Sequence, residues 1–250
     1  PGGQVLNIYD ELYKASDRIR HVITAHEQGA AHAADGYARS TGKVGVVIAT
    51  SGPGASNLVT GIATAYLDST PMVAITGNVP LPLIGRDSFQ EVDIAGITMP
   101  ITKHNYIVKD VKVLEDTIRE AFQIAKSGRP GPVLIDVPKD VQIALCDYVQ
   151  GGEVAPDPFQ SPTQEELVQA AKMVAESKRP FLYSGGGIVS ADASKELLSF
   201  ADRIDAPIGT SMMGLSAVAS SYPGFLGMTG MHGRYAASKA MAEADLIIAV

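Results

Sequence analysis

The stretch His26-Glu-Gln-Gly-Ala-Ala-His-Ala-Ala-Asp-Gly-Tyr-Ala-Arg-Ser-Thr-Gly42 decides how the rest of this chain is interpreted. Before it, residues 19–24 are rich in β-branched side chains and predict a short strand. Within it, small residues at helical spacing predict a helix that packs closely against a sheet. These residues are Ala30, Ala31, Ala33, Ala34 and Ala38. Glu27 is therefore expected where a strand ends and a helix begins.

Glu27 has two interpretations at such a junction. In open α/β sheets, ligands bind outside the carboxyl ends of the strands, so this carboxylate could be catalytic. It could instead stabilise the helix N-terminus, an effect of about 0.3–1 kcal/mol, and position alone favours this second interpretation. A zinc protease motif is excluded, because His-Glu-x-x-His would need a histidine where Ala30 stands.

The composition limits the classes of function. Twenty basic and 27 acidic residues give a net charge of −7, which argues against nucleic acid or an anionic membrane as the main partner. The one cysteine, Cys146, excludes an internal disulfide framework and a cysteine-rich metal site. No apolar run approaches the ~20 residues of a membrane span. The chain starts without Met and stops at Val250 within a predicted strand, so both ends are expected to be cut.

Alternating strands and helices are predicted in the first part of the chain. The strands are expected at residues 19–24, 44–50, 71–76, 103–109 and 133–137, and the helices at 8–13, 30–38, 58–66 and 113–125. Near-continuous apolar runs such as 44–50 are typical of parallel strands that are buried on both faces. This order predicts an α/β domain with a doubly wound parallel sheet over residues 1–146.

Two loops of this domain are candidates for a binding site. The turn Ser51-Gly-Pro-Gly54 lies between a strand and a helix, where an anion or a polar ligand can bind. It matches neither Gly-x-Gly-x-x-Gly nor a Walker loop, so it is weak support for a phosphate site. The irregular loop of residues 81–93 surrounds one aromatic residue, Phe89, with polar groups, and such loops are often functional. Its charged and amide residues are Arg86, Asp87, Gln90, Glu91 and Asp93.

The composition changes after residue 146. Residues 147–162 are rich in Gly, Pro and acidic side chains, which predicts a linker. Thr163-Gln-Glu-Glu166 is a capping-box pattern that opens a helix over 167–176. Further strands are expected at 180–183, 206–209 and 245–250, with helices at 194–203 and 236–242. This order predicts the start of a second, Rossmann-like α/β domain over residues 163–250.

Taken in order, these features resemble the large catalytic subunits of the acetolactate synthase (acetohydroxyacid synthase) family, within the thiamine diphosphate enzymes. The glutamate block and the Ser-Gly-Pro-Gly turn are shared across that superfamily, whereas Phe-Gln-Glu, Lys-His-Asn and Gly-Met-His-Gly together point to this family. The resemblance covers almost the whole chain except the linker. The matching blocks are Pro1-Gly-Gly-Gln4, His26-Glu-Gln-Gly-Ala-Ala-His32, Ala49-Thr-Ser-Gly-Pro-Gly54, Phe89-Gln-Glu91, Lys103-His-Asn105, Gly128-Arg-Pro-Gly-Pro132, Pro138-Lys-Asp140 and Gly230-Met-His-Gly233.

The resemblance implies a reaction and a role for Glu27. The glutamate of this family hydrogen-bonds N1′ of the cofactor's aminopyrimidine and promotes loss of the proton from the thiazolium C2. A buried carboxylate without a cation has a raised pKa, so it can share a proton with a ring nitrogen. Pyruvate is then decarboxylated and joined to a second 2-keto acid. Pyruvate gives 2-acetolactate and 2-ketobutyrate gives 2-aceto-2-hydroxybutyrate, at the first step of branched-chain amino-acid biosynthesis.

The resemblance also implies roles for further residues. Glu27, Gln90 and Lys139 are expected to be catalytic, and Phe89, Gln90 and Lys139 to line the substrate channel. The expected contacts to thiamine diphosphate are Gly2, Gly3, Glu27, Ser51, Gly52, Pro53, Gly54 and Asn57. The expected contacts to FAD, which does no net redox chemistry in this family, are Arg129, Gly185, Gly186, Gly187, Ser211, Met212, Met231, His232 and Gly233. Two positions depart from the family: Asn78 stands where Gln is commoner, and Arg86 where a small polar residue is usual.

The family's cofactor lies between the first domain of one subunit and the third domain of another. A homodimer or tetramer with a shared active site is therefore expected, with pyruvate and 2-ketobutyrate as substrates and with room for a regulatory small subunit. The family's Mg²⁺ motif, Gly-Asp-Gly followed by a distant Asn, does not occur in these 250 residues, so the Mg²⁺ ligands are expected beyond Val250. The chain alone is expected to be inactive. Its expected location is the bacterial cytoplasm, or a plastid or mitochondrion in a eukaryote.

Two other interpretations stay open. Another thiamine enzyme, such as a pyruvate oxidase, would share Glu27 and the Ser-Gly-Pro-Gly turn, although the Phe89 loop and Gly230-Met-His-Gly233 favour the synthase. A non-catalytic nucleotide-binding or subunit-interaction protein could keep the fold without the chemistry, because function depends on the site rather than on the fold.

Overall fold

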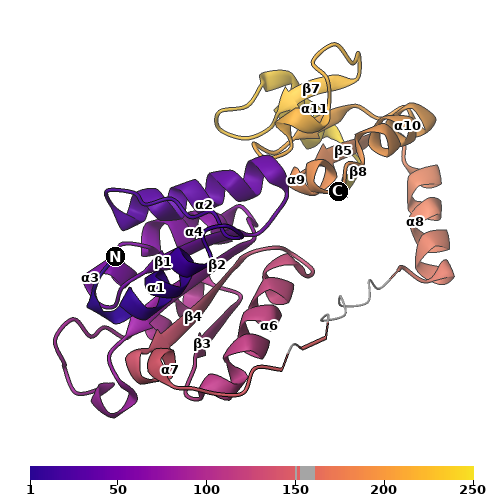
Figure 1. Ribbon diagram of the computed structural model, residues 1–250. Coiled ribbons are helices and arrows are strands. Elements are labelled where there is room, and N and C mark those ends of the chain that lie inside the picture. Colours follow the sequence, from indigo (N-terminus) through magenta and orange to yellow (C-terminus); the bar gives the residue numbers. More distant parts are fainter. Residues whose placement is uncertain (150, 153–160) are drawn as a thin grey trace. The chain divides into compact units, whose positions relative to one another are not determined.

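The computed structural model of this chain describes residues 1–149, 151–152 and 161–250. Contacts divide the chain into two compact units, Pro1–Phe159 and Gln160–Val250. Each unit contains its own parallel sheet (Figure 1). Of the predicted linker, 147–162, residues 150 and 153–160 lie outside the described residues.

The sheet of the first unit has the strand order β1-β2-β4-β3 in its described residues, and all neighbouring strands are parallel. These strands are β1 (Gly45–Ala49), β2 (Met72–Asn78), β3 (His104–Ile107) and β4 (Pro132–Pro138). The central strand β4 is buried at every position, which explains its continuous apolar sequence. The predicted α/β class is confirmed.

Helices cover both faces of this sheet (Figure 1). Leu58 and Ile62 pack on one face together with Ala31, whereas Ala121 and Ala125 pack on the other. The helices of this unit are α1 (Leu6–Lys14), α2 (Glu27–Thr41), α3 (Pro53–Ser56), α4 (Val59–Leu67), α5 (Ile94–Thr98), α6 (Leu114–Lys126) and α7 (Lys139–Ile143). Short 3-10 helices are η1 (Gly3–Val5), η2 (Leu81–Leu83), η3 (Met99–Ile101) and η4 (Val111–Val113).

The predicted small-residue helix is confirmed as α2, although Ala33 of that set is exposed. A Cβ atom on Gly45 of β1 would overlap the Ala34 carbonyl oxygen, and one on Gly61 of α4 would overlap the Ala31 Cβ atom. The backbones of β1 and α4 therefore approach α2 so closely that only glycine fits at these two positions. This packing places the N-terminus of α2 beside the carboxyl end of β1.

The predicted strand at residues 19–24 was wrong. This segment is irregular and largely exposed, with Val22 at 74% and Ile23 at 65% of full exposure. β-branched residues form a strand only where a neighbouring strand accepts their backbone hydrogen bonds, and 19–24 belongs to neither sheet of the described residues. The expectation that 44–50 is buried on both faces was also wrong in part, because β1 is an edge strand and Val46 is 44% exposed.

The second unit repeats the parallel arrangement with the strand order β7-β6-β5-β8 in the part of the chain that the structure describes. Its strands are β5 (Pro180–Ser184), β6 (Ile208–Thr210), β7 (Phe225–Met228) and β8 (Leu246–Ala249). Its helices are α8 (Gln164–Glu176), α9 (Gly186–Ser190), α10 (Ser194–Ile204) and α11 (Tyr235–Glu243), with the 3-10 helix η5 (Leu215–Ala217). The predicted capping box is confirmed, because Thr163 and Glu166 exchange hydrogen bonds at the start of α8. The predicted ranges missed β7 and α9 in this unit, and the short helices α3, α5 and α7 in the first unit.

Lys103, in the Lys-His-Asn block, caps the C-terminus of α6. Its ammonium group donates to the carbonyl oxygens of Ile124 and Ser127, the second at 2.6 Å. Cations stabilise helix C-termini because the last carbonyls there lack helical partners.

We expect Lys103→Met to lower the free energy of unfolding by about 1–3 kcal/mol in urea titrations. Lys126→Met, exposed on the last turn of the same helix, is the control and should change it by less than about 0.5 kcal/mol. Equal losses in the two variants would contradict the capping role.

Candidate functional site

The first group of predicted site residues lies at the carboxyl end of β1. The chain leaves this strand through Thr50, Ser51 and Gly52 and enters α3 at Pro53. Gly52 has a φ of +59°, a conformation that side chains disfavour. The hydroxyl oxygens of Thr50 and Ser51 are buried and have no hydrogen-bond partner among the described residues. Buried hydroxyls are normally paired, so these two indicate a place where a polar ligand belongs.

Glu27 is the first residue of α2 and lies within this group. His26 caps the helix, because its Nδ1 accepts from the backbone N–H of Gln28 at 3.1 Å. The amide Nδ2 of Asn57, which follows α3, donates to Glu27 Oε2 at 3.0 Å. The structure therefore brings together Glu27 and Asn57, two predicted site residues that are 30 positions apart.

Glycines allow the backbone to pack closely against Thr50 beside this carboxylate. A Cβ atom on Gly54 would lie 2.6 Å from Thr50 Cγ2 and 3.4 Å from Glu27 Oε1. A Cβ atom on Gly2 would lie 2.6 Å from the Thr50 hydroxyl, whereas one on Gly3 would meet no atom within 4 Å. Gly2, Gly54 and Glu27 thus meet around Thr50. Thr50 was not among the predicted site residues, although its position directly after a buried strand could have identified it.

The electrostatics of Glu27 differ from the expectation of a raised pKa. Burial is the largest influence on the Glu27 carboxyl and acts to raise its pKa. The hydrogen bond from Asn57, a backbone N–H and the nearby His26 act in the opposite direction, and the net result is a lowered pKa. Sequence reasoning anticipated the burial but not these donors, which stabilise the charged form. Burial and, secondly, the charge of Glu27 raise the pKa of Tyr9, which places this α1 side chain near the carboxylate as well.

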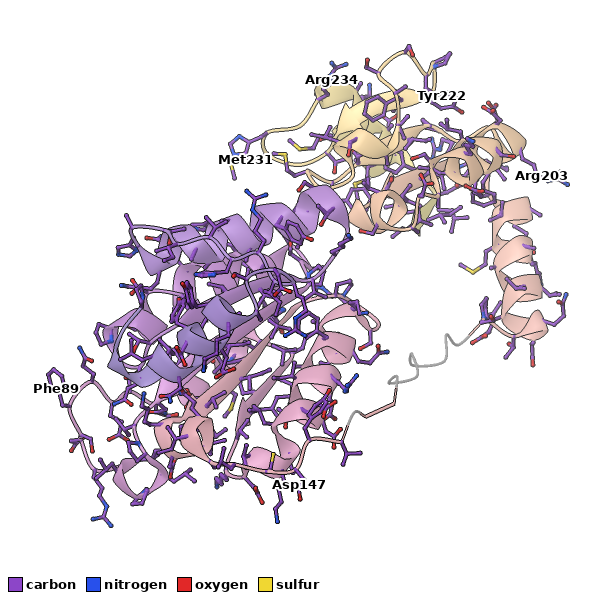
Figure 2. The ribbon with its side chains drawn as sticks, in the orientation of Figure 1. Phe89, Asp147, Arg203, Tyr222, Met231 and Arg234 are labelled. Carbon is purple, nitrogen blue, oxygen red and sulfur yellow. The ribbon has the colours of Figure 1, made fainter. Side chains whose placement is uncertain are left out.

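The loop of residues 81–93 approaches the same place through its backbone. A Cβ atom on Gly52 would lie 2.5 Å from the Gln90 carbonyl oxygen, and Gln90 has a φ of +60°. Phe89 is 85% exposed and points away from the body of the unit (Figure 2). The Glu91 carboxylate accepts from the backbone N–H groups of Gly85, Arg86 and Ser88 and holds the loop in shape.

Lys139 lies at the start of α7, directly after β4. Its Nζ donates to the carbonyl oxygen of Gly3 at 2.9 Å, across 136 positions of sequence. Three residues on, Gln142 donates to the carbonyl oxygen of Gln4 at 2.7 Å. The end of β4 therefore holds the segment that contains Gly2 and Gly3 in place.

Arg129 does not lie with these residues. It precedes β4 and donates to Ser69 Oγ at 2.6 Å and to the Leu67 carbonyl oxygen at 3.1 Å. Ser69 precedes β2, so this contact is at the amino ends of the parallel strands, whereas Glu27 is at the carboxyl ends. Within this unit Arg129 ties the end of α4 to the turn before β4.

The predicted site residues of the second unit follow the carboxyl ends of three adjacent strands. Gly185, Gly186 and Gly187 follow β5, Ser211 and Met212 follow β6, and Met231, His232 and Gly233 follow β7. The hydroxyls of Ser184 and Thr210, the last residues of β5 and β6, are buried without a hydrogen-bond partner among the described residues. Met231 is 92% exposed and lies at the edge of this unit (Figure 2). This end of the sheet has open positions, since a Cβ atom on Gly187 would meet nothing within 4 Å.

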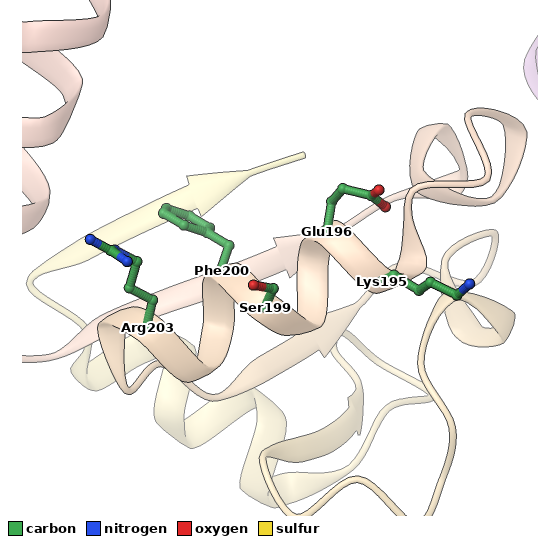
Figure 3. A pocket seen from close by; sticks show the side chains of 5 residues that line it. All are labelled: Lys195, Glu196, Ser199, Phe200 and Arg203. Atoms are coloured by element: carbon green, nitrogen blue, oxygen red, sulfur yellow. The ribbon is translucent and has the colours of Figure 1, made fainter.

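A separate pocket lies along α10, and all its lining residues come from that one helix (Figure 3). They are Lys195, Glu196, Ser199, Phe200 and Arg203. Among the residues that the structure describes, no second element contributes a group to it, so it is given no role. In the ranges that the structure describes, no three His, Cys, Asp or Glu side chains are grouped to hold a metal ion, and no helix is long and apolar enough to cross a membrane.

One buried carboxyl near the site was missed. Asp136, in β4, is 1% exposed and accepts hydrogen bonds from Thr76 and Asn78 of β2. Burial raises the pKa of Asp136 to about 6, with a smaller contribution from Asp93, while the two hydrogen bonds act to lower it. The sequence predicts a buried apolar strand at residues 133–137, and the Asp within this run could have identified Asp136 as a candidate.

The raised pKa of Asp136 predicts a pH-dependent stability. Between about pH 4 and 6 the folded protein binds more protons at this carboxyl than the unfolded chain does. The free energy of unfolding should therefore fall as pH rises through this window, by up to about 3 kcal/mol, and the contribution should be constant above it. We expect urea titrations from pH 4 to 7 to give Asp136→Asn a less negative slope than the wild type. Identical slopes would show that Asp136 does not titrate in this window.

Two family models match the chain. The model for the thiamine pyrophosphate enzyme N-terminal TPP binding domain matches residues 1–97, and the model for the central domain matches residues 167–250. An acetolactate synthase large subunit of Corynebacterium glutamicum is 51% identical over 253 residues, covering 100% of this chain and 40% of the relative. An acetolactate synthase of Arthrospira platensis is 51% identical and a probable acetolactate synthase large subunit of Methanocaldococcus jannaschii is 50% identical, each over 100% of this chain. The chain spans 40–45% of the length of these three relatives.

Proposed function

Because this chain belongs to the thiamine pyrophosphate enzymes, we propose that it is the cofactor-binding and central part of an acetolactate synthase catalytic subunit. The reaction joins pyruvate, with loss of CO2, to a second 2-keto acid. The observation that carries this proposal is the pairing of Glu27 with Asn57 beside the buried, unpaired hydroxyls of Thr50 and Ser51. Identity of about half of all residues with acetolactate synthases along the entire chain supports it.

The residues at the carboxyl end of β1 fit the aminopyrimidine part of thiamine diphosphate. An amino-substituted ring offers both donors and acceptors, which the unpaired hydroxyls of Thr50 and Ser51 can satisfy. Gly2 and Gly54 keep Cβ atoms away from Thr50. When bound, thiamine diphosphate supplies the carbanion-stabilising chemistry that decarboxylation of a 2-keto acid requires.

Glu27 holds a proton on the cofactor ring in this proposal. Its lowered pKa keeps the carboxylate ionised, and an ionised carboxylate accepts a hydrogen bond from a protonated ring nitrogen. Asn57 occupies Oε2 and thereby fixes the plane of the carboxylate, so that Oε1 faces Gly54. The two residues have separate tasks: the Glu27 carboxylate accepts the hydrogen bond from the protonated ring nitrogen, and Asn57 orients the carboxylate.

Phe89, Gln90 and Lys139 are proposed to lie on the substrate side. The backbone of Gln90 is in contact range of Gly52, so its loop borders the same place as Glu27. Lys139 carries a positive charge at the end of β4 and already reaches Gly3. A cation there suits the carboxylate of a 2-keto acid such as pyruvate or 2-ketobutyrate.

The second unit is proposed to bind FAD at the carboxyl ends of β5, β6 and β7. The buried hydroxyls of Ser184 and Thr210, together with the open position at Gly187, support this assignment. Nucleotides commonly bind at this end of an open parallel sheet. Arg129, whose guanidinium donates to Ser69 and to the Leu67 carbonyl oxygen, is the one proposed FAD contact that comes from the first unit. We also propose that Mg²⁺ binds together with the diphosphate of the cofactor. The full protein is proposed to form a dimer whose subunits share the active sites, and to bind a regulatory small subunit.

The test is product formation by the protein at its natural full length. With pyruvate, thiamine diphosphate, Mg²⁺ and FAD, we expect 2-acetolactate, and added 2-ketobutyrate should yield 2-aceto-2-hydroxybutyrate. Acetaldehyde or acetyl phosphate in their place would assign the protein to another thiamine enzyme. Absence of turnover with any 2-keto acid, although the cofactors bind, would overturn the enzymatic proposal.

A further inference from the structure

Asp136 is a buried carboxyl whose hydrogen bonds both come from the end of one neighbouring strand. Thr76 lies directly opposite Asp136 in the pairing of β2 with β4. The Thr76 hydroxyl donates to Asp136 Oδ1 at 2.6 Å, and the amide Nδ2 of Asn78 donates to Oδ2 at 2.5 Å. With 1% of its surface exposed, Asp136 has no access to water that could replace either donor.

The carboxylate determines which way the Asn78 amide faces. A carboxylate only accepts hydrogen bonds, so the NH2 group of Asn78 must face Asp136. The amide oxygen of Asn78 then faces the other way, where it accepts from the backbone N–H of Val79 at 2.8 Å. Val79 is the residue at which β2 has ended and the chain turns toward the loop of residues 81–93.

The start of that loop has a second anchor in the first turn of α7, directly after β4. The backbone N–H of Leu81 donates to Asp140 Oδ2 at 3.1 Å. Asp136 of β4 and Asp140 of α7 thus both hold the first residues of the loop, Asp136 through Asn78 and Asp140 directly. Later in the loop, Gln90 is in contact range of Gly52. Because the Glu91 carboxylate ties the middle of the loop to its end, we expect a shift at Val79 to displace Phe89 and Gln90 as well.

The residue between the two donors also supports the cofactor side of the site. Gly77 lies between Thr76 and Asn78, and a Cβ atom on it would overlap the Gln4 carbonyl oxygen and Val5 Cγ1. The segment that contains Gly2 and Gly3 therefore rests on the same end of β2. A displacement of this strand end would change both the substrate loop and the cofactor contact.

We propose that Asp136 is a positioning residue for the proposed reaction, because it holds the Asn78 amide that sets the start of the loop bearing Phe89 and Gln90. The reaction named in this inference rests on the proposed function, whereas the hydrogen bonds of Asp136 do not depend on it. Asp136 lies in the interior and contacts neither substrate nor cofactor in this role.

The inference is tested by swapping the two side chains, Asn78 and Asp136, in the full-length protein. Asn78→Asp alone places two carboxylates together, which repel each other in the interior. We expect it to speed hydrogen exchange of the amides of residues 79–91 by at least about tenfold and to raise KM for pyruvate more than it lowers kcat. Adding Asp136→Asn restores one carboxylate and one amide, with their positions exchanged. The new amide can accept from Thr76 and donate to the new carboxylate, which can still accept from the backbone N–H of Val79.

The double variant is therefore expected to return loop exchange and KM to near wild-type values. Thr76→Val, which removes one donor but leaves the Asn78 amide in place, is the control and should leave loop exchange nearly unchanged. The inference would be overturned if adding Asp136→Asn fails to rescue Asn78→Asp. It would also be overturned if hydrogen exchange of residues 79–91 is unaltered in Asn78→Asp alone. If the wild type forms no acetolactate, the proposed function fails. Hydrogen exchange of the amides of residues 79–91 still decides whether Asp136 positions the loop.

Discussion

Replacement of Glu27 by Gln is expected to lower kcat for acetolactate formation by about 10²- to 10⁴-fold, the usual contribution of a positioned acid or base. Gln keeps the size of the side chain and can still accept from Asn57, so the fold should be preserved. It cannot carry the negative charge that stabilises a proton on the cofactor ring. The loss should therefore appear in turnover, because the interaction is strongest when the ring is protonated.

The measurement is steady-state turnover with saturating thiamine diphosphate, together with cofactor affinity from a binding titration. Glu196→Gln is the control, since Glu196 is exposed on α10 and should leave turnover unchanged. A decrease in kcat of less than fivefold with unchanged cofactor affinity would indicate that Glu27 only stabilises the helix N-terminus. A loss of cofactor binding alone would assign it to affinity rather than to proton transfer.

Replacement of Gly52 by Ala is expected to give a large loss of stability. Gly52 has a φ of +59° and its Cβ atom would lie 2.5 Å from the Gln90 carbonyl oxygen. The variant thus combines backbone strain with a clash against another segment's backbone. We expect the free energy of unfolding to fall by about 2–5 kcal/mol. The displaced Gln90 loop should also raise KM for pyruvate.

Gly42→Ala separates these two causes. Gly42 ends α2 with a φ of +68°, and a Cβ atom there would meet nothing within 4 Å. Only the strain remains, so the expected loss is about 1–2 kcal/mol with unchanged KM. The two variants are compared by urea titration and by steady-state kinetics. Equal losses in both, with equal KM values, would contradict the contact between Gly52 and the Gln90 loop.

Much of the fold follows from local patterns in the sequence. The apolar run of β4 and the amphipathic stripe of α6 were predicted to within one residue at each end, because a continuous apolar run indicates a strand buried on both faces and apolar residues at helical spacing indicate a helix. The capping box at Thr163 was predicted from an equally local pattern, since its partner is only three residues away. Segment 19–24 has the same β-branched character as a strand, yet it forms none.

The candidate site divides in a similar way. Glu27, the Ser-Gly-Pro-Gly turn and Asn57 were identified from their order along the chain and its family resemblance, and the structure places Glu27 against Asn57. Thr50 and Asp136 were missed because each is a single polar residue in or after an apolar run. The Asn57 amide, which lowers the pKa of Glu27, could not be assigned to it from the sequence, because Asn57 is 30 positions away.

The sequence by itself determined the α/β class, most helices and strands, and the residues from which a site could be built. Only the tertiary structure decided that Thr76 and Asn78 face Asp136, 60 and 58 positions away, and that Lys139 reaches Gly3 across 136 positions. The reason is physical. Periodic burial specifies which face of an element is apolar, but strand pairing and register determine which polar groups meet, and these depend on the packing of the whole sheet.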